Sequence, residues 1–94
     1  MGLVVLLLSS TEGWSAGLEK GTDAYGKGDY ATALREWKPL AEQGNASAQT
    51  NLGFMYANGQ GVPQNDVTAL KWYTRAADQG NTTAQREIKE LENY

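Results

Sequence analysis

Apolar residues recur at intervals of three and four along most of the chain, which is the spacing of one face of an α-helix. The clearest stripe lies within residues 30–41 and is formed by Tyr30, Ala33, Leu34, Trp37, Leu40 and Ala41. The same spacing returns at residues 48–56 and again at 69–77. The pattern therefore predicts an all-α protein of about five helices, over residues 17–27, 30–43, 46–58, 66–79 and 82–93.

The sequence also repeats itself. Residues 31–52 align with residues 67–88 at an offset of 36, without a gap and with nine identities in 22 positions. Upstream, Tyr25 corresponds to Tyr56, where the offset is only 31. The turn between the two helices of the first repeat is therefore expected to be five residues shorter than that of the second. Such self-similarity is typical of a helical repeat protein.

Short polar residues and glycines mark where the helices begin and end. Gly44 and Gly80 each follow an alanine-rich helical turn, and a glycine there can take the left-handed conformation that ends a helix. The predicted N-cap residues, whose side chains accept hydrogen bonds from free backbone N–H groups, are Asp29, Asn45, Asn65 and Asn81.

Two residues are unfavourable in the helices predicted around them. Gly53 costs about 1 kcal/mol relative to alanine, so we expect a close neighbouring side chain to compensate, from Trp72 or Tyr73. Pro39 lacks a backbone N–H and is expected to bend or shorten its helix near Arg35.

A known family combines these features. The segments Ala48–Tyr56, Asn58–Val62 and Ala69–Gly80 resemble the Sel-1-like repeat, a relative of the tetratricopeptide repeat. The resemblance implies a right-handed α-α superhelix of antiparallel helix pairs with a concave face. It also implies an adaptor that brings other proteins into complexes, and bacterial members are often exported. The expected organisation is a first repeat at 17–44, a second repeat at 45–80 and a capping helix at 81–94.

The first 16 residues differ from the rest. Residues 3–8 are wholly apolar and are followed by small and polar residues. A run this short cannot span a bilayer, which takes about 20 residues. It is typical of the end of a truncated signal peptide, with Ser15-Ala16 as the cleavage edge, although no Lys or Arg precedes it. The alternative is a hydrophobic or disordered tail that packs on the first helix.

Composition narrows the chemistry. The 94 residues include no histidine and no cysteine, which removes the commonest general base, metal ligand and disulfide. The formal charge of −3 comes without a basic stripe, so nucleic-acid binding is not expected. Five of the aromatic residues lie at helical spacing and are interpreted as core rather than as a ligand box: Tyr25, Trp37, Tyr56, Trp72 and Tyr73. We therefore predict no catalytic, cofactor-binding or metal-binding residues and expect the protein not to be an enzyme.

The candidate partner-binding surface lies on the first helix of each repeat, on the side away from the core. On the helix over 46–58 this side presents Asn51, Phe54 and Asn58. The repeat register extends the surface to the preceding and following helices, at Lys20, Asp23, Lys27, Glu87, Glu90 and Tyr94. Phe54 is either an apolar anchor for a partner peptide or a residue that packs on the tail or the last helix.

The leading hypothesis is an exported scaffold that binds a partner protein or peptide through its concave face, in the periplasm or outside the cell. If the N-terminal run is not a signal, a cytoplasmic location is expected. The alternative is a structural envelope protein that self-assembles without a dedicated peptide ligand, since a solenoid of about two repeats leaves its apolar ends poorly covered. This predicts a weak homo-oligomer, and neither hypothesis includes stable membrane insertion.

Overall fold

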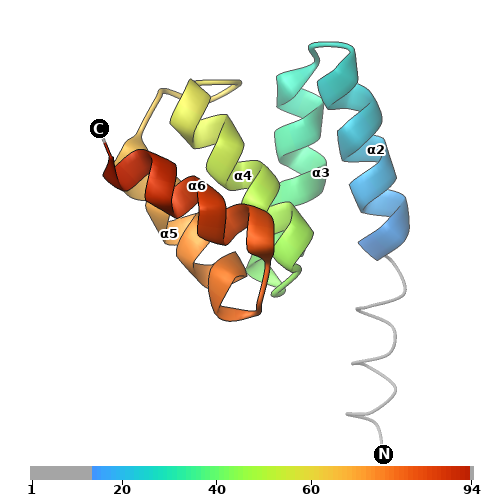
Figure 1. Ribbon diagram of the computed structural model, residues 1–94. Helices are drawn as coiled ribbons and strands as arrows, with labels where there is room; N and C mark the ends of the chain where they lie inside the picture. The colour runs from blue at the N-terminus through green and yellow to red at the C-terminus, as the bar shows by residue number, and fades with distance from the viewer. Residues whose placement is uncertain (1–13, 94) are drawn as a thin grey trace, which may run out of the picture.

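The computed structural model describes residues 14–93 and confirms an all-α fold. Figure 1 shows the helices packed in sequence as antiparallel pairs, with α2 and α6 at opposite ends of the array. Each helix packs against its sequence neighbours, and α4 also contacts α6. The five helices are α2 (Trp14–Gly26), α3 (Tyr30–Glu42), α4 (Ala46–Asn58), α5 (Asp66–Asp78) and α6 (Thr82–Glu92). None of the helices in these residues is long and apolar enough to cross a membrane.

The predicted N-caps are confirmed at all four positions. The side-chain oxygen of each accepts a hydrogen bond from the backbone N–H three residues later, and this satisfies one of the donors that a helix start leaves free. The donor–acceptor distances are 3.2 Å at Asp29, 2.8 Å at Asn45, 3.1 Å at Asn65 and 2.9 Å at Asn81. Gly44 and Gly80 end the preceding helices with φ of 107° and 92°, as predicted.

The core is small and rich in alanine, which allows the helices to approach closely. The larger cluster lies between α2, α3 and α4, around the buried residues Trp37, Leu40, Leu52 and Met55. The second cluster lies between α5 and α6, around Tyr73 and three alanines, and Ile88 and Leu91 pack against it. The chain thus buries one apolar cluster for each repeat.

A buried glutamine ties the second helix of one repeat to the first helix of the next. Gln49 is 1% exposed, and its Nε2 donates to the Ala41 carbonyl at 3.0 Å while its Oε1 accepts from Gln79 at 2.9 Å. The equivalent residue, Gln85, donates to the Ala77 carbonyl at 3.3 Å. The two bonds of Gln49 satisfy polar atoms that burial would otherwise penalise, whereas Gln85 is exposed.

Gly53 has the close neighbour that was predicted, and the neighbour is Tyr73. A Cβ atom at Gly53 would overlap the Tyr73 ring, coming within 2.8 Å of its Cζ atom. The first repeat uses the same device, since a Cβ atom at Gly21 would overlap the Trp37 indole. In both repeats a glycine on the first helix makes room for an aromatic ring from the second.

Of the two effects predicted for Pro39, a bent or a shortened helix, the proline does not shorten its helix. α3 continues through Pro39 to Glu42. Pro39 stands in the last turn of α3, so it removes only the bond to the Arg35 carbonyl. Arg35 is exposed, and water can satisfy that carbonyl.

The first helix begins three residues earlier than predicted, at Trp14 rather than at residue 17. Trp14 packs against the larger cluster, and its Nε1 donates to Gln43 Oε1 at 2.9 Å. The segment from Trp14 to Ala16 therefore belongs to the folded unit. The apolar run at residues 3–8 lies outside the described residues.

Candidate functional site

Two hollows lie side by side on the face formed by α2, α4 and α6. The first hollow, between α2 and α4, has a volume of about 320 Å³ and is lined by Thr22, Tyr25, Trp37, Asn51 and Phe54. The second hollow, between α4 and α6, has a volume of about 730 Å³. Phe54 lines both, so its half-buried ring forms the ridge between them.

The second hollow draws its lining from three helices and the turn before α5. Its lining residues are Phe54, Ala57, Asn58, Gln64, Asp66, Tyr73, Arg86, Glu87, Glu90 and Leu91. The Phe54 ring meets the Tyr73 ring edge-on, with 5.8 Å between their centroids. Asn58 donates through Nδ2 to the Phe54 carbonyl at 2.9 Å, so this amide is already engaged on its own helix.

The two hollows are the same site in successive repeats. The helix α2 matches α4 at an offset of 32, which carries Gly21 onto Gly53, while α3 and α4 match α5 and α6 at an offset of 36. With these offsets every residue of the first hollow falls on a residue of the second. The pairs are Thr22 with Phe54, Tyr25 with Ala57, Trp37 with Tyr73, Asn51 with Glu87 and Phe54 with Glu90.

Five of the predicted surface residues line these hollows. Asn51 lies in the first hollow and Phe54 in both, and the second hollow also includes Asn58, Glu87 and Glu90. The hollows thus place side by side residues that lie up to 39 positions apart in the chain, from Asn51 to Glu90.

The predicted register of the first helix is corrected by the structure. Lys20, Asp23 and Lys27 are exposed, and none of them lines either hollow. The turn between α2 and α3 is four residues shorter than that between α4 and α5, rather than the five expected. An error of one residue rotates a helical position by about 100°, so Thr22 faces Phe54 and Asp23 does not. Tyr94, the remaining predicted position, lies outside the described residues.

The first hollow is aromatic, and the polar atoms of its tyrosine and tryptophan have hydrogen-bond partners. Tyr25 packs against Tyr30 and Trp37 with ring centroids 5.3 and 5.7 Å apart, and its hydroxyl donates to Gln60 Oε1 at 2.8 Å. The Trp37 Nε1 donates to the Leu18 carbonyl at 3.3 Å. This aromatic group is part of the packed structure, as the sequence interpretation had it.

The second hollow contains a polar group without a partner. Tyr73 is fully buried, and its hydroxyl makes no hydrogen bond within residues 14–93. Burial raises the pKa of this hydroxyl well above its ordinary value, and the nearby Glu87 carboxylate raises the pKa further. The phenol is therefore neutral and able to accept or donate a hydrogen bond.

The rim of the second hollow is acidic. Asp66, Glu87 and Glu90 line it, and Arg86 is the only basic residue in its lining. The Arg86 Nε lies 3.9 Å from Glu87 Oε1, with 67% of the Arg86 side chain and 24% of the Glu87 side chain exposed. A pair this exposed holds the arginine only weakly. Within residues 14–93 no group of acidic residues is close enough to hold a metal ion.

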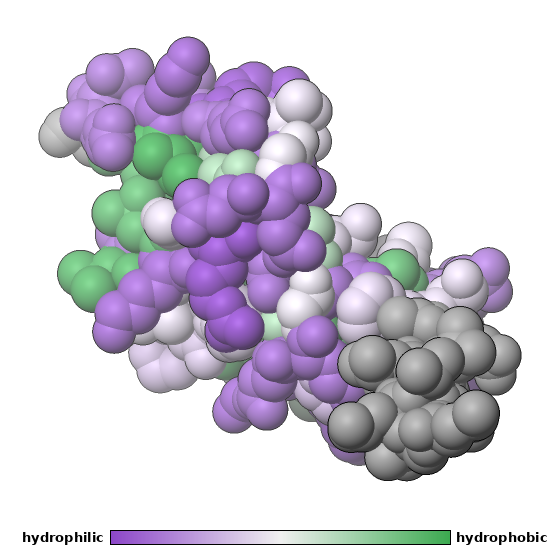
Figure 2. All heavy atoms as spheres, turned by 90° about the horizontal axis from the view of Figure 1, so that it is seen from below, coloured by the Kyte–Doolittle hydropathy of each residue, from purple (hydrophilic) through white to green (hydrophobic). Residues whose placement is uncertain are grey.

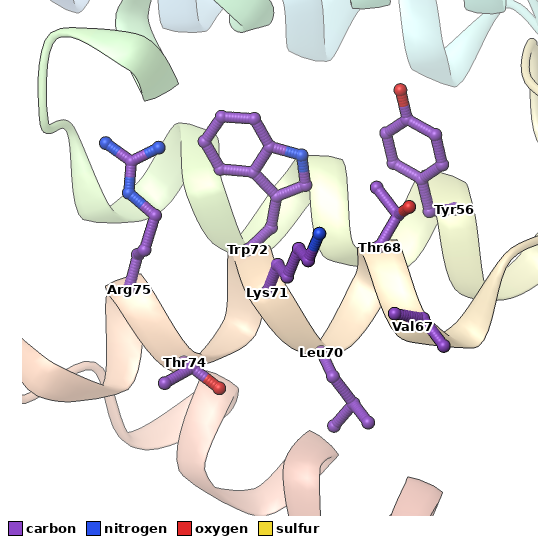
Figure 3. A pocket seen from close by; sticks show the side chains of 8 residues that line it. All are labelled: Tyr56, Val67, Thr68, Leu70, Lys71, Trp72, Thr74 and Arg75. Carbon is purple, nitrogen blue, oxygen red and sulfur yellow. The ribbon is translucent and has the colours of Figure 1, made fainter.

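A third hollow, of about 820 Å³, runs along α5 and has a different character. Figure 3 shows its side chains pointing in several directions around the helix, with Leu70 turned away from Trp72 and Tyr56. Val67 is 66% exposed, and the Arg75 guanidinium lies over the Trp72 ring at 4.8 Å. This is an apolar surface rather than a pocket with converging polar groups, and Figure 2 shows hydrophobic surface gathered at this end of the molecule.

Known proteins share this repeat. The family model described as Sel1 repeat matches residues 46–81. An exopolysaccharide production negative regulator from Rhizobium leguminosarum bv. viciae is 38% identical over 60 residues, which are 64% of this chain and 22% of that protein. The chitin synthase regulator SKT5 of Malassezia restricta is 37% identical over 57 residues, which are 61% of this chain and 4% of the relative.

A putative sel1-like repeat-containing protein, L18 of Acanthamoeba polyphaga mimivirus, is 46% identical over 44 residues, or 47% of this chain and 8% of the relative. This chain thus spans less than a quarter of the length of each of these proteins. No solved structure matches it significantly. Sel1 repeats are helical repeats that generally mediate protein interactions and are typically non-catalytic. Residues 46–81 thus match the Sel1 repeat, and the helix pairs around them are consistent with a short array of such repeats.

Proposed function

We propose that this chain is a scaffold module that binds a partner protein or peptide across the face formed by α2, α4 and α6. The observation that carries the proposal is the position of Phe54, an apolar ring that is half-buried between two hollows. Aromatic residues surrounded by hollowed, partly polar surface are the usual anchors of protein interfaces.

Photo-crosslinking tests this proposal. A benzophenone amino acid placed at position 51, beside the ridge, is expected to form a discrete adduct with a partner in the native host. The matched control places the same group at Asp78, an exposed residue at the end of α5 outside the three hollows. Equal labelling from both positions would contradict the proposal.

Substitution of Phe54 completes the test. Phe54→Ala is expected to reduce the adduct formed from position 51, because it removes the ridge. The variant also loses the edge-on contact with Tyr73, worth about 0.5 to 1.5 kcal/mol, so capture must be measured at a temperature where thermal unfolding shows the variant to be folded. If folded Phe54→Ala forms as much crosslinked adduct with the partner as the unmodified protein, Phe54 is excluded as the anchor of the partner.

Self-association is the second candidate, and the apolar surface of α5 favours it. Val67 is exposed and Leu70 is half-buried on the surface of α5, and the matching surface of a second copy could cover them. Light scattering of Val67→Lys beside the unmodified protein tests this. We expect a concentration-dependent dimer that the lysine abolishes, and a strict monomer at high concentration would exclude it.

Export is part of the proposed role. The apolar run at residues 3–8 has the composition of a signal-peptide core, which favours a periplasmic or secreted location. The mass of the mature protein, isolated from its host, decides this. A cleaved chain supports export, and because Trp14 is packed in the fold, we expect any cleavage to lie before it.

A further inference from the structure

We propose that the second hollow takes the cationic side chain of a basic partner segment, an arginine or a lysine. This inference rests on the proposed function and specifies which chemistry the module selects. Charge complementarity, an unpartnered buried hydroxyl and an apolar wall carry it, and of the two hollows on this face only the second combines all three.

The charge of the lining favours a cation. Asp66 comes from α5, and Glu87 and Glu90 come from α6, so carboxylates face the hollow from two helices. Arg86 offsets one of them through an exposed contact with Glu87. A net negative rim attracts a basic segment and repels an acidic one, and this gives selectivity between partners.

The Tyr73 hydroxyl gives the cation a specific target. It is buried and has no partner within residues 14–93, which makes it an exception to the rule that buried polar atoms are paired. The phenol oxygen can accept a hydrogen bond from a guanidinium or ammonium N–H. The hydroxyl is buried in the free protein, so a donor reaches it only after a lining side chain moves, and we propose that the partly exposed Glu87 is the one that moves.

The wall of the hollow suits the stem of such a side chain. Lysine and arginine pack their methylene groups on apolar surface and keep the charge at a polar end. Phe54 and Leu91 supply that surface here. The first hollow has no carboxylate in its lining, and the Trp37 N–H in it is already bonded to a carbonyl. The first hollow therefore has neither the carboxylates nor the free hydroxyl that would bind a basic side chain in the second hollow.

A titration followed by ¹⁵N NMR of the full chain tests the inference. The probes are blocked pentapeptides, Ala-Ala-X-Ala-Ala, in which X is Arg, Lys, Gln, Leu or Glu, at an ionic strength of 0.15 M. The Arg and Lys peptides are expected to shift the amide signals of residues 86–91 and of Tyr73. The Gln, Leu and Glu peptides are expected to bind about tenfold more weakly or not at all, since a charge-assisted hydrogen bond contributes about this factor.

Variants separate a specific site from general attraction. Glu87→Gln and Glu90→Gln are each expected to lower the affinity for the Arg peptide about threefold or more. Glu92→Gln, on the same helix but outside the hollow, is expected to leave the affinity unchanged. Tyr73→Phe is expected to lower the affinity for the Arg peptide about threefold or more, because it removes the hydroxyl that accepts the hydrogen bond and leaves the ring in place. Equal losses for Glu87→Gln and Glu92→Gln, or unchanged binding by Tyr73→Phe, would overturn the proposal.

The remaining outcomes identify other occupants and also overturn it. Equal binding of the Gln or Leu peptide would make the hollow a neutral apolar groove. Shifts at residues 86–91 that depend on protein concentration would show a second copy of the chain, and contacts from residues 3–8 would show the chain's own N-terminal segment. Failure of every peptide would exclude the cationic site and leave the scaffold proposal to the crosslinking experiment, which uses neither peptides nor these variants.

Discussion

The two hollows of the α2–α4–α6 face share one backbone arrangement and carry different chemistry. In each, a glycine on the first helix accepts an aromatic ring from the second, Gly21 with Trp37 and Gly53 with Tyr73. In the first hollow the polar atom of the ring has a partner, since the Trp37 Nε1 donates a hydrogen bond to the Leu18 carbonyl. The second leaves the Tyr73 hydroxyl without a partner in the described part of the chain.

This difference separates what the repeat needs in order to fold from what it can use to bind. The close contact of glycine and ring is common to both hollows, so it belongs to the packing of the helix pair. The unpartnered hydroxyl and the carboxylates of Glu87 and Glu90 occur only in the second hollow. Burial of an unpaired hydroxyl costs free energy because no protein group forms a hydrogen bond with it. A ligand that supplies the missing hydrogen bond therefore gains the most binding free energy there.

The largest effect is expected from filling the shared glycine position. Gly53→Ala and Gly21→Ala should each destabilise the protein by about 2 to 3 kcal/mol, because a rigid aromatic ring occupies the space of the new methyl group. This loss outweighs the gain in helix propensity, which is about 1 kcal/mol. Urea denaturation monitored by circular dichroism measures both variants.

The control for these variants is Gly26→Ala, at the end of α2. A Cβ atom there meets nothing within 4 Å, so we expect a stability equal to or slightly above that of the unmodified protein. A loss of stability in Gly53→Ala without a loss in Gly21→Ala would contradict the equivalence of the two hollows. It would show that only the second repeat depends on this close contact.

A smaller effect distinguishes the two aromatic rings. Trp37→Phe is expected to cost about 1 to 2 kcal/mol, since it removes a hydrogen bond and leaves a small cavity. Tyr73→Phe is expected to change the free energy of unfolding by less than about 0.5 kcal/mol or to stabilise the protein, because the hydroxyl it removes is unpaired. Chemical denaturation near pH 7 measures both, and a loss of more than 1 kcal/mol for Tyr73→Phe would reveal a partner for the hydroxyl.

The pH dependence of stability at alkaline pH also distinguishes Tyr73 from Trp37. Burial raises the pKa of Tyr73 in the folded protein, whereas an unfolded tyrosine ionises near its ordinary value of about 10. Above that pH the unfolded chain binds fewer protons than the folded chain, so stability falls as the pH rises. The unmodified protein should lose stability more steeply than Tyr73→Phe between pH 10 and 11.5, by up to about 1.4 kcal/mol per pH unit. Trp37→Phe has no such ionisation to remove and should follow the slope of the unmodified protein.

The helices were predictable because their ends are specified by single residues. Asp29, Asn45, Asn65 and Asn81 cap them in the structure as the sequence predicts, and the helix α4 has the predicted bounds. Pro39 does not shorten α3, because the effect of a proline depends on how much helix follows it, and only three residues of α3 follow Pro39. The Tyr73 hydroxyl could not be predicted, since pairing of a buried group depends on neighbours that three helices bring together.

The positions of the candidate surface residues relative to one another were predictable where the repeat register was secure. The offset of 36 placed Glu87 and Glu90 correctly beside Phe54, because aligned identities connect those helices. For α2 the register rested on the match of Tyr25 with Tyr56, and it was one residue wrong. Pairing Gly21 with Gly53 gives the observed offset of 32 and also predicts that the helix starts at Trp14, opposite Ala46. The match between two glycines that each accommodate an aromatic ring is thus a better guide to register than a matched tyrosine.

The smallest effect tests this register directly. Thr22→Ala and Asp23→Ala replace adjacent exposed residues of α2, so both should alter stability by less than about 0.5 kcal/mol. Only Thr22 lines the first hollow with Phe54. Thr22→Ala is therefore expected to shift the NMR signals of the Phe54 ring, while Asp23→Ala leaves them in place. The opposite result would restore the offset of 31 and remove the equivalence of the two hollows, because Asp23 rather than Thr22 would then correspond to Phe54.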